Sequence, residues 1–369
     1  MPIAPLHGHE TLRERLLASL ARETLPASLL LVGARGVGKQ RLALWLGQAI
    51  LCQGADEGGA RPCGRCQSCR YALELAHPDL HWFFPRVRKE LDVDATPEQV
   101  AADLAEVAQE RVKRRGLYPP SSGSEGIFVA MVRALVQRAA VSPAICRRKV
   151  FVVGDAERMV SQAGADQAAN AFLKLLEEPP ADTTIVLTSS EPGALLPTIR
   201  SRVVTVRVPP VTDADVRAFL ADPAVTEGLK ELGIGGGSVE ERVRVAAGAP
   251  GVLLGGAERS AAVSDARRLL DAALTGTRAD RLRVAFTRGA AGARGAFSDV
   301  LDALTELLRD LAHDAALPGP DRSPRSPARA LGASRAVDAV ERAKERAAGN
   351  ASPQLVTEGL LRELAASLR

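Results

Sequence analysis

The chain has 369 residues, enough for two or three domains at roughly 150 residues each. Hydrophobic residues at 46% and charged residues at 25% are globular proportions, which excludes wholesale disorder. The net charge of +4 is too small to indicate nucleic-acid binding by itself, and 3% aromatic residues argue against a base-stacking platform. The sequence has no apolar run of about 18 residues and no basic-then-apolar N-terminus. We therefore expect a cytoplasmic protein that does not cross a membrane.

The first 210 residues alternate between strand and helix patterns. Four strands are predicted, at residues 28–32, 150–153, 184–188 and 203–208. Four longer helices are predicted, at residues 11–24, 40–50, 127–140 and 165–178. Because strands that alternate with helices form parallel sheets, this region predicts an α/β domain with a mainly parallel sheet.

Residues 85–126 have the character of an insertion into this domain. A helix is expected from Pro97 to about Arg115, followed by a proline- and serine-rich mobile loop over residues 118–124. Nothing in this segment matches a known motif.

The second part of the chain predicts helices only. Thr212 is placed to cap the first of them, and we put domain boundaries near residues 210 and 258. A flexible linker is expected over residues 317–327. Apolar residues recur at helical spacing in the last region: Leu301, Leu304, Leu308, Leu311, Leu360, Leu361 and Leu364. Such stripes form either an internal core or contacts with neighbouring subunits.

A P-loop pattern follows the first predicted strand. Gly33, Gly36, Gly38 and Lys39 occupy positions where backbone N–H groups cradle phosphates and a lysine reaches the outer ones. The helix N-terminus after the loop adds favourable positive charge. The last position, however, holds Gln40 instead of the Ser or Thr that binds Mg²⁺, and an amide is a poorer ligand for that ion.

A second departure stands at the end of the strand at residues 150–153. P-loop ATPases carry a metal-binding carboxylate there, and this chain has Gly154 followed by Asp155. Asp155 has either a residual metal role or the role of a turn cap. Loss of both Mg²⁺ ligands predicts a nucleotide site that does not hydrolyse ATP.

Four cysteines lie close together in the sequence. Cys52, Cys63, Cys66 and Cys69 fall within 18 residues, whereas Cys146 stands apart. In a cytosolic chain this spacing favours four thiolates around a structural zinc ion over disulfides, with unligated buried thiols as the alternative. Cys146 is expected to be an ordinary core or surface residue.

Three further segments, taken with the P-loop and the cysteine module, carry a resemblance to a known family. They are AFLKLLEEPP at residues 171–180, TIRSRV at residues 198–203 and NASPQLVTEGLL at residues 350–361. Together they resemble the bacterial clamp-loader family of AAA+ proteins. The resemblance implies an AAA+ domain over residues 1–210 with a zinc module at 52–69, a helical lid over 211–258 and an all-α collar for oligomerisation over 259–369.

Within that family, the degraded nucleotide site is similar to the delta-prime branch of the DNA polymerase III clamp loader. This similarity implies a non-hydrolysing subunit of a hetero-pentameric ring with motor subunits and a delta subunit, which loads the sliding clamp on primed DNA during replication. Arg202 would be an arginine finger donated to a neighbour's ATP site, with a solvated strand-edge arginine as the alternative. Thr188 stands at the family's sensor position. Val252 replaces the arginine of a second sensor.

The sequence is also compatible with two other functions. The first is an ATP-hydrolysing motor subunit of the same family, which would use Lys39 and Asp155 in a modified site. The second is a zinc-dependent nucleic-acid-binding protein built on a decayed P-loop. Salt-sensitive binding of DNA by the isolated chain would favour the second.

Overall fold

The computed structural model describes residues 2–55, 60–87, 95–119, 125–159, 166–286, 294–316, 326–348 and 352–368. The chain forms two compact units, the first running through Leu254 and the second beginning at Gly255. Most of the loop expected at residues 118–124 and of the linker expected at 317–327 lies outside the described residues.

The first unit is built on a five-stranded parallel sheet with the order β2-β5-β6-β1-β7. Its strands are β1 (Ser28–Val32), β2 (Leu80–Phe83), β5 (Lys149–Val153), β6 (Thr183–Ser189) and β7 (Val204–Arg207). Strands β5 and β6 are buried along their whole length, as expected for apolar runs covered on both faces. The α/β domain with a parallel sheet predicted from the sequence is confirmed, and all four predicted strands form. The strand of this sheet that the sequence did not predict is β2, which is four residues long and follows α3.

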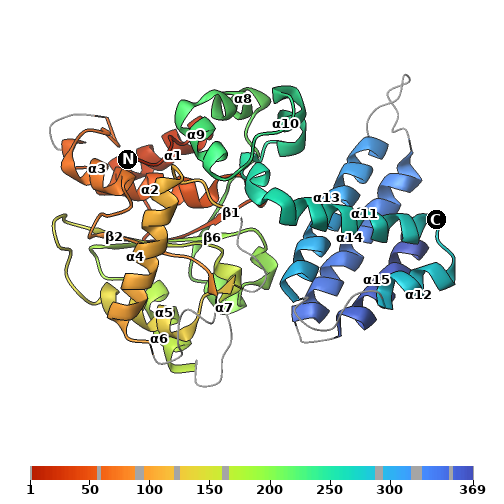
Figure 1. Ribbon diagram of the computed structural model, residues 1–369. Coiled ribbons are helices and arrows are strands. Elements are labelled where there is room, and N and C mark those ends of the chain that lie inside the picture. Colours follow the sequence, from red (N-terminus) through yellow and green to blue (C-terminus); the bar gives the residue numbers. More distant parts are fainter. Residues whose placement is uncertain are drawn as a thin grey trace. The chain divides into compact units, whose positions relative to one another are not determined.

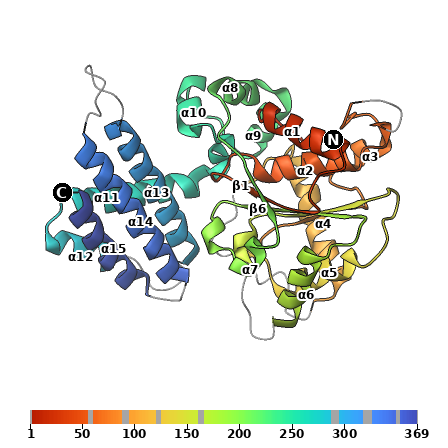
Figure 2. The same ribbon diagram turned by 180° about the vertical axis from the view of Figure 1, so that it is seen from behind.

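Helices cover both faces of this sheet. They are α1 (Glu10–Ala21), α2 (Lys39–Ile50), α3 (Gln67–Leu73), α4 (Pro97–Lys113), α5 (Val129–Ala139), α6 (Asp166–Glu177) and α7 (Pro197–Arg200). Helices α1 and α2 lie on one face and α5 and α6 on the other, while α4 runs from the layer of α2 to that of α5 (Figure 1 and Figure 2). The α/β part of the first unit also contains three single-turn helices: η1 (Gln53–Ala55), η2 (Ala156–Arg158) and η3 (Pro192–Ala194). A separate antiparallel pair is formed by β3 (Arg86–Val87) and β4 (Glu125–Gly126).

Helix α4 is the helix that the sequence placed in the insertion. Its start is fixed by Thr96, which accepts a hydrogen bond from Gln99 N while the Gln99 side chain accepts one from Thr96 N. Pro97 occupies the first helical position, where its missing N–H costs nothing. Four residues of one face are buried: Val100, Leu104, Ala108 and Val112.

A small helical subdomain, residues 211–254, ends the first unit. It contains α8 (Asp213–Ala221), α9 (Pro223–Glu231), α10 (Val239–Ala246) and most of the short helix η4 (Pro250–Gly255). The predicted cap at Thr212 is present, because its hydroxyl accepts from Asp215 N at 3.2 Å. A core of its own includes Val216, Phe219 and Leu229.

The second unit is entirely helical within its described residues. Its helices are α11 (Gly256–Leu274), α12 (Arg278–Phe286), α13 (Arg294–Ala316), α14 (Pro327–Ala348) and α15 (Pro353–Leu368). The predicted leucine stripes face its interior, since Leu301, Leu304 and Leu361 are fully buried in one core. No described helix is both long and apolar enough to cross a membrane.

Candidate nucleotide site and cysteine cluster

The P-loop joins the end of β1 to the start of α2. Gly36 and Gly38 have φ values of +81° and +100°, a backbone conformation that glycine adopts without steric cost. The small helical subdomain packs closely against Gly36, because a Cβ on Gly36 would lie 2.7 Å from Val252 N. Gly251 N donates to Gly36 O at 2.9 Å. The residue expected at the second sensor position, Val252, therefore packs directly against the loop.

Lys39, the P-loop lysine, turns back onto its own loop. Its Nζ donates to Gly33 O, Ala34 O and Ser190 Oγ, each at 2.9 Å. Burial lowers the pKa of Lys39, against the opposing effect of the Asp155 and Glu157 carboxylates. Because an ammonium group has three donors, every one of them has an acceptor inside the chain.

Gln40 fills the position at which a P-loop protein would hold its metal. Trp82 Nε1 and the Tyr118 hydroxyl both donate to Gln40 Oε1 at 3.2 Å. A Cβ built on Gly154 would lie 2.3 Å from the same oxygen, so the amide occupies the space of a side chain at residue 154. Burial raises the pKa of Tyr118 to about 12, which keeps its hydroxyl protonated as a donor.

An arginine from the insertion lies in an aromatic cage beside Gln40. The Arg111 guanidinium carbon is 4.6, 3.7 and 3.9 Å from the ring centroids of Trp82, Phe84 and Tyr118. Its Nη1 is buried and has no hydrogen-bond partner among the described residues. Burial lowers the pKa of Arg111, and the three ring faces stabilise the charge that remains.

Hydrogen bonds within the chain hold Asp155 and Glu157, the two acidic residues that follow β5. Asp155 N donates to Thr188 Oγ1 at 3.0 Å, and Asp155 has a left-handed φ of +49°. Glu157 Oε1 accepts from Ser190 N at 2.9 Å, and burial together with the Asp155 charge raises the pKa of Glu157. Thr188, expected at a sensor position, thus positions the backbone of Asp155.

The four clustered cysteines come together as the sequence predicted. The Sγ atoms of Cys52, Cys63, Cys66 and Cys69 all lie within 4.8 Å of one another, and those of Cys63 and Cys69 are 3.9 Å apart. A tetrahedral zinc with Zn–S bonds of about 2.3 Å needs sulfurs about 3.8 Å apart. Four thiols at this spacing fit a closed structural zinc site, with each sulfur as one ligand.

Backbone N–H groups donate to three of the four sulfurs, whereas burial raises the pKa of the fourth, Cys69. The backbone N–H groups of Cys63, Cys66 and Cys69 donate to the sulfurs of Cys52, Cys63 and Cys66, at 3.3, 3.3 and 3.4 Å. Hydrogen bonds from the backbone of Cys66 and Arg65 lower the pKa of Cys63 to about 6. Gly54 packs against this site, since a Cβ there would lie 2.7 Å from Cys63 Sγ.

Cys146 lies beside the module without joining the four-sulfur cluster. Its Sγ is 3.3 Å from Ser68 Oγ and 3.6 Å from His77 Nε2. The Asp79 carboxylate fixes the loop that carries it, accepting from the backbone N–H groups of residues 144–146. Burial raises the pKa of the Cys146 thiol, so it is held as a neutral group.

Arg202 follows α7 at the edge of the sheet, away from the cysteine module in the sequence and in the fold. Its Nε donates to Glu177 Oε2 at 3.1 Å and its Nη1 to Thr198 O at 3.1 Å. The Arg202 side chain is 29% exposed, and that of Glu177 is 57% exposed. The guanidinium is therefore oriented by α6 and α7 while it remains accessible to a neighbouring molecule.

Comparison with known proteins identifies the family. The family model described as "DNA polymerase III, delta subunit" matches residues 8–212, more than half of the chain. The chain belongs to this family. The match covers the P-loop, the cysteine module, the insertion and Arg202, which are the features described above.

Curated relatives of this DNA polymerase III family extend the comparison. The chain is 26% identical over 219 residues to "DNA polymerase III subunit delta'" of Bacillus subtilis, covering 59% of this chain and 52% of the relative. It is 33% identical over 215 residues to the protein of the same name from Pseudomonas aeruginosa, covering 57% and 52%. It is also 31% identical over 226 residues to "DNA polymerase III subunit gamma/tau" of Mycobacterium tuberculosis, covering 61% and 32%. The alignments thus span about half the length of the first two relatives.

Sequence reasoning missed the residues that contact Gln40 at the candidate nucleotide site of this family member. Trp82, Arg111 and Tyr118 come from the unexpected strand β2 and from the insertion. Glu177, the partner of Arg202, was part of the quoted segment 171–180 but carried no assigned role. The aromatic residues around Trp82 were the one available signal, because this chain has few aromatics and three of them stand at residues 82–84.

Proposed function

We propose that this chain is a non-hydrolysing, delta-prime-type subunit of the DNA polymerase III clamp loader. Its family membership and the names of its relatives support a component of that complex. The division into an AAA+ domain over residues 1–210, a lid over 211–258 and a collar over 259–369 belongs to the same proposal. So do the partners: motor subunits and a delta subunit in a hetero-pentameric ring, with the sliding clamp and primed DNA reached through the complex.

The observation that carries the non-hydrolysing role is the position of the Gln40 side chain. The amide lies over Gly154, so neither of the two residues that would bind Mg²⁺ in a P-loop ATPase supplies a suitable ligand. Lys39 is already bound to three acceptors of its own chain. ATP hydrolysis by this chain would require all of these groups to move.

Arg202 is proposed as an arginine finger for the neighbouring motor subunit. A guanidinium stabilises the charge that develops on a transferred phosphoryl group, and it acts equally well from another chain. Glu177 pairs with the partly exposed Arg202 side chain in the single chain. In the ring, the phosphates of a neighbour's ATP would replace this carboxylate as the partner of the guanidinium.

The proposed role of Arg202 as an arginine finger is tested in the assembled clamp loader. In Arg202→Ala we expect turnover at the neighbouring ATP site to fall by about 10³-fold, the lower end of the effect of such fingers. This loss would appear as the disappearance of that site's share of DNA-stimulated hydrolysis. Arg200→Ala is the matched control, because Arg200 is exposed, lies two residues away and should leave the rate unchanged. Full DNA-stimulated hydrolysis by the Arg202→Ala complex would refute the finger.

The non-hydrolysing role is tested separately with the isolated chain. We expect no Mg²⁺-dependent turnover of ATP, with or without primed DNA. Turnover that Lys39→Ala abolishes would instead establish an ATP-hydrolysing motor subunit, which is the alternative function.

The cysteine module is proposed to hold one structural zinc ion. Its four sulfurs complete a tetrahedron, which leaves no position for water and hence no catalytic role. Bound zinc would fix η1 and α3 against each other, because Cys52 lies just before η1 and Cys69 lies in α3.

A further inference from the structure

The segment that ends the insertion helix α4 has a tightly specified backbone. Gly116 N donates to Arg111 O at 2.7 Å and Arg115 N to Val112 O at 2.9 Å, the bonds of a Schellman motif. Arg115 and Gly116 have φ values of +57° and +75°. A Cβ on Gly116 would lie 2.8 Å from the Ile3 side chain, so only glycine fits. Leu117 and Tyr118 directly follow this turn. We call residues 111–118 the strap.

One side of the strap enters the small helical subdomain. Leu117 is 6% exposed and belongs to the core that contains Val216 and Leu229. The strap approaches α9 so closely that a Cβ on Gly228 would lie 2.7 Å from Arg114 O. An ion pair reinforces this contact, with Arg115 Nε donating to Glu227 Oε2 at 2.9 Å.

The other side of the strap enters the P-loop domain. Tyr118 donates to Gln40 Oε1 on α2, and Arg111 stacks on Trp82 and Phe84 at the end of β2. These contacts lie at and beside Gln40, the residue in the P-loop position whose Ser or Thr would bind Mg²⁺. The strap therefore touches both the loop that would bind phosphate and the subdomain that would close over it.

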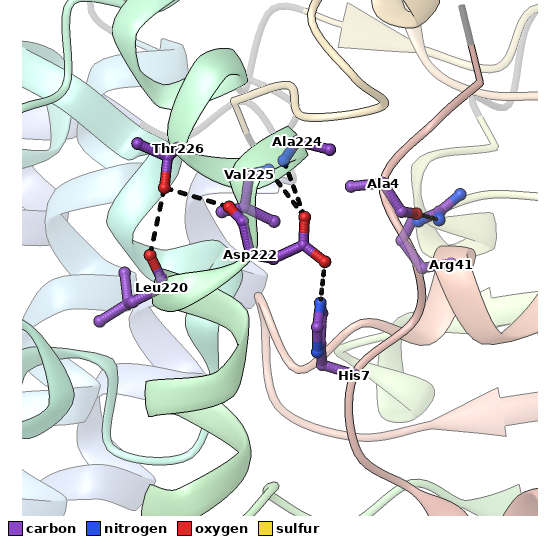
Figure 3. Close-up of polar contacts among 8 residues, drawn as sticks. All are labelled: Ala4, His7, Arg41, Leu220, Asp222, Ala224, Val225 and Thr226. Carbon is purple, nitrogen blue, oxygen red and sulfur yellow. Dashed lines mark hydrogen bonds and ion pairs between the residues drawn. The ribbon is translucent and has the colours of Figure 1, made fainter.

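The N-terminal segment strengthens the same connection. Ala4 N donates to Arg115 O at 2.7 Å, and the Arg41 guanidinium of α2 donates to Ala4 O. His7 Nε2 lies 3.1 Å from Asp222 Oδ2, the carboxylate that also caps α9 through its other oxygen (Figure 3). Residues 2–7 thus pass between the P-loop domain and the subdomain and bind to both.

We propose that the strap is a built-in clasp that holds the small helical subdomain against the P-loop domain without any nucleotide. A bound nucleotide could couple the P-loop domain to the small helical subdomain only while the nucleotide occupies the loop. The strap is part of the chain, so its contacts with both parts are present at all times.

The test compares two leucines of the insertion that are equally buried. Leu117 packs in the core of the subdomain, and Leu104 packs in the core of the sheet domain at 7% exposure. In Leu117→Ala we expect amide hydrogen exchange of α8, α9 and α10 to rise by about tenfold or more, with β5 and β6 unchanged. Leu104→Ala should not raise exchange selectively in these three helices. Equal exchange in α8, α9 and α10 for Leu117→Ala and the unaltered chain would overturn the proposal.

A glycine pair keeps the proposal testable should Leu117→Ala fail to fold. Gly228→Ala places a methyl group against the strap backbone, whereas Gly235→Ala meets open space in the same subdomain. Alanine favours helix over glycine, so α9 by itself should gain from the change. We expect Gly228→Ala nevertheless to speed exchange of residues 111–118 by about tenfold and Gly235→Ala to leave it unchanged. Unchanged exchange of the strap in Gly228→Ala would refute the clasp.

Adding ATP and Mg²⁺ gives a further criterion. Exchange in α8–α10 of the unaltered chain should be the same with and without nucleotide, because the strap already holds these helices. Protection of α8–α10 by nucleotide of about tenfold would show that the nucleotide provides the coupling, and the proposal would fall.

Discussion

Gln40 and Gly154 occupy one shared space. The amide oxygen of Gln40 stands 2.3 Å from where a Cβ on residue 154 would lie, and it accepts hydrogen bonds from Trp82 and Tyr118 there. In the sequence these are two separate departures from the P-loop pattern, 114 positions apart. In the structure they are a single feature, because the Gln40 amide occupies the space that a side chain at residue 154 would need.

This shared space predicts that substitutions at the two positions are not additive. Gly154→Asp alone should destabilise the fold by about 2–4 kcal/mol, since the new side chain collides with the Gln40 amide and adds a buried charge. The double variant Gln40→Ser with Gly154→Asp should recover at least about 1 kcal/mol of that loss. Urea unfolding of the two single variants and the double variant measures the coupling, and strictly additive effects would contradict the shared space.

Lys39 should contribute to the stability of the folded chain through its own hydrogen bonds. Lys39→Ala leaves Gly33 O, Ala34 O and Ser190 Oγ without this donor, which we expect to cost about 1–3 kcal/mol in the free energy of unfolding. Lys174→Ala on α6 is the control, because Lys174 is exposed and its loss should change stability by less than about 0.5 kcal/mol. Equal stability of the two variants in denaturant titrations would mean that the bonds of Lys39 contribute nothing.

The cysteine module should carry about one zinc ion per chain, measured by elemental analysis of the purified protein. Cys66→Ser should lose the metal and lower the thermal midpoint, because one of the four thiolates is removed and binding is coupled to folding. Cys146→Ser provides the comparison, since its sulfur lies outside the four-sulfur cluster and the metal content should stay the same. A metal-free, stably folded preparation with four titratable thiols would refute the zinc site.

His81 should make stability depend on pH in mildly acidic solution. Burial, together with the nearby Arg138 charge, lowers the pKa of His81 from its ordinary 6.5 to about 4, and its ring stacks on Phe151. Between these values the unfolded chain binds more protons than the native one, so stability is complete above pH 6.5 and declines as the pH falls towards 4. We expect a loss of about 1–3 kcal/mol over this window, allowing for the partial exposure of His81.

The control for this pH effect is His81→Phe, which keeps an aromatic ring against Phe151 but cannot take up a proton. Its unfolding free energy should change less between pH 6.5 and 4 than that of the unaltered chain. Identical pH profiles for the two proteins would assign the acid sensitivity to other groups.

The sequence by itself determined those features that depend on local spacing. Alternating strand and helix patterns predicted the parallel sheet, glycine spacing predicted the P-loop between β1 and α2, and short cysteine spacing predicted the four-sulfur cluster. For the P-loop and the cysteine cluster, the relevant residues lie on one element or on neighbouring ones, so that local backbone geometry brings them together. For the sheet, the sequence predicted the strands and their parallel arrangement but not the pairing of β1 with β6 and β7.

Only the tertiary structure decided which residues surround Gln40 at the candidate nucleotide site. Trp82 and Tyr118 reach Gln40 from 42 and 78 positions away, and Gly251 reaches Gly36 from the small helical subdomain. The insertion matched no motif, yet its helix supplies Arg111 and its end supplies Leu117 and Tyr118. Contacts of this kind depend on how helices pack across a sheet and on which side chains fit the space left over. No periodicity along the chain encodes them, because packing is decided by shape and burial among residues distant in sequence.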